Sequence, residues 1–95
     1  MSNIWNVYFT KKTSKKLKTL PNKVMNLLNV LTWEIERYGP VRGNWPNYSK
    51  LGPNRHHCHL TKKGKPTFVA VWEESETGIQ LVEITYVGSR EKAPY

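Results

Sequence analysis

The order of two hydrophobic patterns constrains this fold more than any other feature of the sequence. Over residues 24–38, apolar side chains recur at helical spacing. Gly39-Pro40 follows and predicts the end of that helix, because glycine adopts a left-handed conformation and proline cannot continue a helix. Beyond this helix the pattern changes to apolar or alternating runs, which predict the strands 55–61, 67–73 and 79–87.

The segments around these elements complete the prediction. Residues 4–9 alternate and are β-branched or aromatic, so they predict a first strand. Thr10 or Thr13 can cap a short helix whose lysines face outward. Residues 39–54, rich in proline and glycine, predict an ordered connection. Polar, glycine-containing turns at 62–66 and 74–78 join the last three strands into an antiparallel meander.

One strand, two helices and three strands, in that order, predict an α+β fold. The expected arrangement is β-α-α-β-β-β, with an antiparallel sheet packed against a two-helix hairpin on one face. A chain of 95 residues has room for one hydrophobic core, so residues 1–95 are expected to form a single domain.

The aromatic residues are expected mainly in or against the core. Trp5 and Trp72 fall on predicted core strands, and Tyr38 continues the helical spacing of the apolar positions. Trp45 and Tyr48 in the proline-rich connection are expected to pack against the body of the protein.

Charge indicates the kind of partner. The chain has 15 Lys and Arg against 7 Asp and Glu, all of them Glu, for a net charge of +8. This balance favours a polyanionic partner, either nucleic acid or an acidic protein. The absence of aspartate argues against clustered carboxylates that would hold magnesium. No apolar run long enough for a membrane span and no secretory signal are present, and there is one cysteine, so a cytoplasmic location is expected.

The segment RHHCHL, residues 55–60, is the sharpest local feature. In a strand, successive side chains point to opposite faces, so Arg55, His57 and His59 share one face. Cys58 belongs in the core, which places the two histidines and the arginine on the opposite surface. Imidazoles beside a cation suit the binding or cleavage of a phosphodiester, although two surface histidines with no ligand are an equally acceptable interpretation.

The neighbouring residues bear on phosphate and metal binding. The turn after this strand carries three lysines that are predicted to bind phosphate: Lys62, Lys63 and Lys65. The lysines between residues 11 and 23 form either a surface that binds nucleic acid or an ordinary solvated surface. A zinc site is not expected, since one strand offers at most two ligands on a side and no other His or Cys completes a set. No metal and no cofactor are therefore predicted.

The order of elements, the basic second strand and the ending Val87-Gly88-Ser89-Arg90-Glu91 up to Tyr95 resemble the RelE family of bacterial type II toxins. This resemblance implies a ribosome-dependent mRNA endonuclease that a cognate antitoxin silences. It also implies a metal-free attack of the 2′-hydroxyl on the adjacent phosphate.

Residue roles follow from the resemblance by position. His57 and His59 stand where the family has two lysines, Arg90 matches its tail arginine, and Tyr95 matches its late tyrosine. Thr67 stands where the family has a further arginine. One of the two histidines is the candidate base. The other histidine, or Tyr95, assists the leaving group, and Arg90 with Arg55 stabilises the charged phosphorane.

Two other functions remain open at this point. A ParE-like toxin would bind DNA gyrase and cleave nothing, and a non-enzymatic RNA-binding module would bind RNA without cutting it. The expected partners are an acidic or amphipathic antitoxin, the ribosome and mRNA, with no membrane. The free toxin is expected to be monomeric and to form a hetero-oligomer with the antitoxin.

Overall fold

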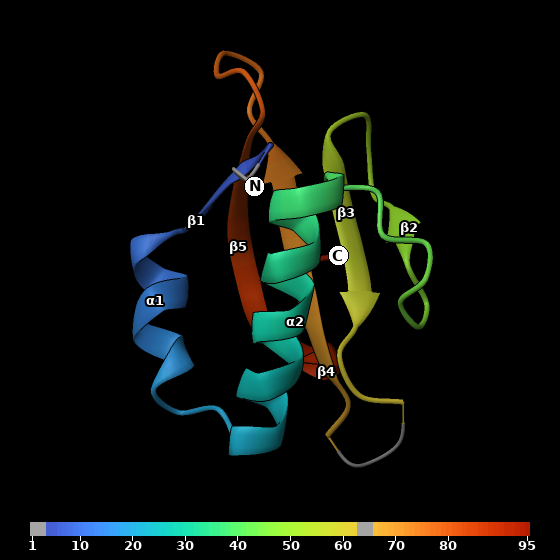
Figure 1. The fold of residues 1–95 in the computed structure, drawn as a ribbon. Helices are drawn as coiled ribbons and strands as arrows, with labels where there is room; N and C mark the ends of the chain where they lie inside the picture. Colours follow the sequence, from blue (N-terminus) through green and yellow to red (C-terminus); the bar gives the residue numbers. More distant parts are fainter. Residues whose placement is uncertain (1–3, 63–65) are drawn as a thin grey trace.

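The computed structural model describes residues 4–62 and 66–95. A five-stranded sheet in the order β1-β5-β4-β3-β2 carries both helices on one face (Figure 1). The elements along the chain are β1 (Asn6–Phe9), α1 (Lys11–Leu17), α2 (Asn22–Tyr38), β2 (Ser49–Lys50), β3 (Arg55–His59), β4 (Phe68–Glu74), β5 (Leu81–Ser89) and the single 3₁₀ turn η1 (Arg90–Lys92). The α+β prediction is confirmed.

Local sequence signals account for the helix ends. Thr10 caps α1, because its hydroxyl accepts a hydrogen bond from the Thr13 backbone N–H at 3.1 Å. Gly39 follows α2 with φ +96°, a conformation that favours glycine. A Cβ at this position would also meet the Trp5 ring at 3.1 Å, so the missing side chain lets the segment before β1 pack against the end of α2.

The core lies between α2 and the sheet. Leu28, Leu31 and Ile35 of α2 are fully buried, and they belong to one cluster with Trp72 of β4 and Ile84 of β5. The predicted placement of Trp72 is therefore confirmed. Trp45 and Tyr48 are partly buried against the same cluster, as predicted. Trp5 also packs there, but it is only partly buried and lies before β1 rather than in a core strand.

Tyr38 is a correction, because its side chain is 64% exposed rather than in the core. At the end of α2, the next residue after Ile35 to face the core is Gly39, and Trp5 packs against it. Tyr38 therefore points away from the core. There its ring meets the ring of Trp33 edge-on, with centroids 6.1 Å apart.

The sheet differs from the prediction in two places. β3, β4 and β5 form the expected antiparallel meander, but β1 pairs with β5 in parallel, so the sheet is mixed. The chain between β1 and β5 contains both helices and three strands, which is ample for the long connection that a parallel pair needs. The expected connection 39–54 also contains a short strand, β2, which pairs antiparallel with β3 and forms an edge of the sheet.

Among the described residues, no helix is both long and apolar enough to cross a membrane.

Candidate functional site

The candidate site is the sheet face opposite the helices, and β3 supplies its two histidines. Cys58 is fully buried in the core, which confirms that the alternating side chains of β3 turn His57 and His59 to the other face. The two imidazole rings lie with centroids 6.2 Å apart. His57 is 9% exposed, whereas His59 is more open to solvent.

The C-terminal tail folds back onto this face. After η1, the Tyr95 ring lies against the His57 ring, with centroids 4.6 Å apart. Arg55, on the same face of β3, donates from its Nη2 to the carbonyl oxygen of Pro94 at 3.1 Å. Arg55 therefore holds the tail in this structure, although the sequence assigns it to phosphate.

Arg90 acts electrostatically on His59 and Tyr95. Burial, the positive charge of Arg90 and the neighbouring His57 all lower the pKa of His59. Burial raises the pKa of Tyr95, and the charge of Arg90 offsets part of that effect. The face thus carries an imidazole that remains neutral to lower pH than usual and a phenol that keeps its proton to higher pH.

Ser49 on the edge strand β2 orients His57. Its hydroxyl oxygen lies 3.1 Å from His57 Nδ1, and its backbone carbonyl oxygen lies 3.3 Å from the same nitrogen. Because a carbonyl oxygen can only accept, this arrangement suits the tautomer with a proton on Nδ1, which leaves Nε2 as an acceptor. No local pattern in the sequence marks Ser49, since the pairing of β2 with β3 depends on tertiary structure.

His56 forms a second hydrogen-bonded group, on the helix side of the sheet. It is fully buried, with Nδ1 2.7 Å from the Tyr48 hydroxyl and Nε2 2.7 Å from Glu74 Oε2. Its ring also stacks on Trp72 with an interplanar angle of 8°. This group ties the chain before β2 to β3 and β4, directly behind the candidate site. Because His56 alternates with His57 along β3, the sequence pattern is enough to put it on the core side, but neither polar partner has a local signal in the sequence.

Of the three lysines predicted to bind phosphate, the structure describes one. Lys62 is exposed in the loop after β3, while Lys63 and Lys65 lie outside the described residues. No group of three or more His, Cys, Asp or Glu side chains that could hold a metal ion occurs within 4–62 and 66–95.

Comparisons with solved structures identify the fold. A chain of the YoeB–YefM complex from Staphylococcus aureus matches with a TM-score of 0.66 and 15% identity, covering 90% of this chain and 97% of that chain. A chain of the RelE–RelB complex from Pyrococcus horikoshii OT3 matches with a TM-score of 0.62 and 17% identity, covering 94% of this chain and 98% of that chain.

The YoeB dimer from Staphylococcus aureus also matches, with a TM-score of 0.63 and 16% identity over 85% of this chain and 91% of that chain. No family model and no curated protein matches the sequence. The chain therefore has the fold of the RelE and YoeB toxins.

Proposed function

We propose that this protein is the toxin of a toxin–antitoxin pair and cleaves mRNA on the ribosome, in the cytoplasm, without a metal ion. The observation that carries the proposal is that the folded-back tail brings Tyr95 against His57, next to His59, whose pKa the charge of Arg90 lowers. The fold shared with toxin–antitoxin proteins supports it, while the chemistry rests on these side chains.

The reaction begins with loss of the proton from a ribose 2′-hydroxyl. His59 is the candidate base, because its lowered pKa leaves it neutral at physiological pH and its side chain is more open to solvent than that of His57. As its nitrogen takes the proton, the 2′-oxygen bonds to the adjacent phosphorus and negative charge develops on the phosphoryl oxygens. The Arg90 guanidinium, which acts on the same imidazole, stabilises that charge with paired donors.

The reaction ends with cleavage of the bond between phosphorus and the 5′-oxygen. Tyr95 is the candidate acid, since its raised pKa keeps the phenol protonated until the leaving oxygen needs a proton. His57 fixes the position of the Tyr95 ring and is itself held by Ser49. The products are a 2′,3′-cyclic phosphate and a 5′-hydroxyl end. Neither a water molecule nor a metal ion takes part in this step.

Mapping of new mRNA ends on translating ribosomes tests this function. The wild type should produce fragments with 2′,3′-cyclic phosphate and 5′-hydroxyl ends, whereas ends with 5′-phosphate would refute the 2′-hydroxyl mechanism. Arg90→Ala should lower the rate by on the order of 10². Arg37→Ala, on α2 at the opposite face of the sheet, is the matched control and should cleave normally. An unchanged rate for Arg90→Ala would refute the site, and RNA binding without cleavage would favour a non-enzymatic RNA-binding module.

The proposed protein partner is an acidic or amphipathic antitoxin. The net charge of +8 supports an oppositely charged partner, and the matching YoeB and RelE structures are complexes with YefM and RelB. Expression of the chain alone should arrest growth, and co-expression with an acidic protein encoded beside it should restore growth and give a complex that purifies together. Harmless expression of the well-folded chain alone would contradict a toxin.

A further inference from the structure

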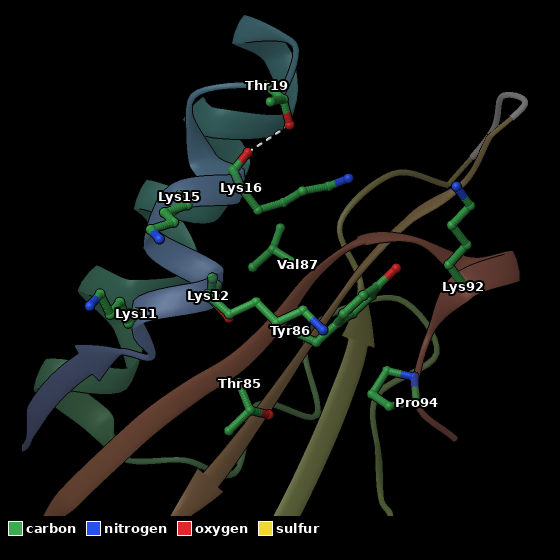
Figure 2. A pocket seen from close by; sticks show the side chains of 11 residues that line it. Lys11, Lys12, Lys15, Lys16, Thr19, Thr85, Tyr86, Val87, Lys92 and Pro94 are labelled. Atoms are coloured by element: carbon green, nitrogen blue, oxygen red, sulfur yellow. Dashed lines mark hydrogen bonds between the residues drawn. The ribbon is translucent and has the colours of Figure 1, made fainter.

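A large hollow lies between α1 and β5, beside the candidate site. It has a volume of about 970 Å³ and is walled by lysines of α1, by Tyr86 and Val87 of β5, and by Lys92 and Pro94 of the tail. Figure 2 shows Lys12 and Lys16 reaching from α1 across the hollow toward Tyr86 and Val87. We call this hollow the α1–β5 groove.

All the charged residues that line the α1–β5 groove are basic. Its lining contains five lysines and no acidic residue: Lys11, Lys12, Lys15, Lys16 and Lys92. None of them takes part in an ion pair with another described residue, because the ion pairs of the described chain join Arg42 to Glu34 and His56 to Glu74. The positive potential in the groove is therefore available to a polyanion.

The floor of the groove offers a fixed aromatic ring. The Tyr86 hydroxyl donates to the carbonyl oxygen of Ser89 at 2.7 Å, which holds the side chain along its own strand. A Cβ on Gly88 would lie 2.7 Å from that hydroxyl, so the absence of a side chain at Gly88 makes room for this placement. A ring that is already ordered can stack on a base with little further loss of conformational entropy.

The groove continues directly from the histidine face. His57 pairs with Val71 across β3 and β4, and Val71 pairs with Tyr86 across β4 and β5, so the three residues form one row across the sheet. Two strand spacings separate the ends of this row, roughly 10 Å. Pro94 belongs to both regions, since it lines the groove and its carbonyl accepts the hydrogen bond from Arg55.

We propose that the α1–β5 groove binds the single-stranded RNA segment next to the cleaved bond. The lysine side chains would contact its phosphates and Tyr86 would stack on one of its bases. Lys12 and Lys16 are one helical turn apart and face the same side, an arrangement that suits successive phosphates of a strand. Basic side chains beside an aromatic platform are the usual elements of single-strand binding. This inference rests on the proposed function, because it assigns the groove to the substrate of that site.

Salt-dependent binding of a short single-stranded RNA tests the groove without catalysis. The probe carries 2′-deoxyribose throughout a central stretch, which prevents cleavage, and its binding is followed by fluorescence anisotropy. Lys12→Gln with Lys16→Gln should weaken binding about tenfold or more and reduce the slope of log K against log salt by about 1.4, since each single-strand phosphate contact contributes about 0.7. Lys18→Gln with Lys23→Gln removes the same charge outside the groove lining and is the matched control.

A second pair of variants tests the aromatic floor. Tyr86→Leu should weaken binding about tenfold without changing the salt slope, because stacking involves no release of counterions, and Tyr86→Phe should retain most of the affinity. Thermal melting of each variant shows whether the fold is kept. Val87 is also in the lining but buried, so it is left unchanged.

The outcomes separate this inference from the proposed function. If the wild type cleaves mRNA but the double lysine variant binds the probe as tightly as the control variant, the groove assignment is wrong and the nuclease stands. If the lysine and Tyr86 variants lose binding but the wild type never cleaves, the groove binds RNA and the nuclease is wrong. If RNA binding is unaffected while the complex with the antitoxin is lost, the groove is a protein-binding surface and the inference is overturned.

Discussion

Removal of the Tyr48 hydroxyl tests whether the buried group behind the candidate site stabilises the fold. In Tyr48→Phe only one oxygen is lost, and the ring that lies near His56 and Trp72 is kept. The hydroxyl lies 2.7 Å from Nδ1 of His56, a residue with no exposed surface. The substitution therefore leaves a buried ring nitrogen without its hydrogen-bond partner.

The size of the effect follows from that geometry. An unsatisfied buried polar group costs about 1–3 kcal/mol. For a domain of this length, each 1 kcal/mol lowers the melting temperature by roughly 4–8 °C. With a central value of about 2 kcal/mol, Tyr48→Phe should melt roughly 8–16 °C below the wild type.

Circular dichroism melts and guanidinium titrations measure this difference. Tyr8→Phe is the matched control, because Tyr8 is 58% exposed and the same atom is removed at the surface. Its melting temperature should stay close to that of the wild type. If Tyr48→Phe melted together with Tyr8→Phe, the hydrogen bond to His56 would contribute nothing measurable and our account of this group would be refuted.

The pKa shifts lead to four further predictions. Arg90→Ala should raise the pKa of His59, measured by NMR titration, because Arg90 lowers it in the folded protein; an unchanged value would place Arg90 away from this imidazole. His59 itself should make stability rise with pH up to about 6.5, its unfolded pKa, because below that value the unfolded chain binds the proton more readily. Burial raises the pKa of Cys58 to about 12, so a thiol reagent at pH 8 should modify it only as the protein unfolds, and rapid labelling of the native protein would contradict this. Burial tends to raise the pKa of Glu34, but hydrogen bonds from Asn44, Trp45 and Arg42 lower it overall; Glu34→Gln should therefore destabilise the protein at neutral pH, and the gap to the wild type should shrink as the pH falls through the folded pKa.

Local patterns in the sequence determined much of the fold of this protein. The helical stripe of residues 24–35 placed α2 on the sheet, and Gly39 ended it, because each feature acts within one or two turns of the chain. The alternation of β3 likewise fixed which face His57 and His59 occupy, since one buried neighbour, Cys58, decides the direction of the whole strand. These parts of the fold and the site could be predicted from residues alone.

Tyr38 marks the limit of such patterns. Its spacing continued the apolar stripe, but the packing of Trp5 against Gly39 moved the inward position by one residue and left Tyr38 in solvent. Periodicity predicts which side of a helix is apolar. Whether a residue at the end of the helix is buried depends on which other segment packs against that end.

The tertiary structure alone decided the partners of the histidines. Ser49 reaches His57, and Tyr48 reaches His56, only because β2 pairs with the free edge of β3. The tail lies on the histidine face because the Pro94 carbonyl accepts a hydrogen bond from Arg55, 39 residues earlier in the chain. The sequence carries no local mark of these contacts, because hydrogen bonds between distant segments depend on which strand edges and faces remain open once the core has packed.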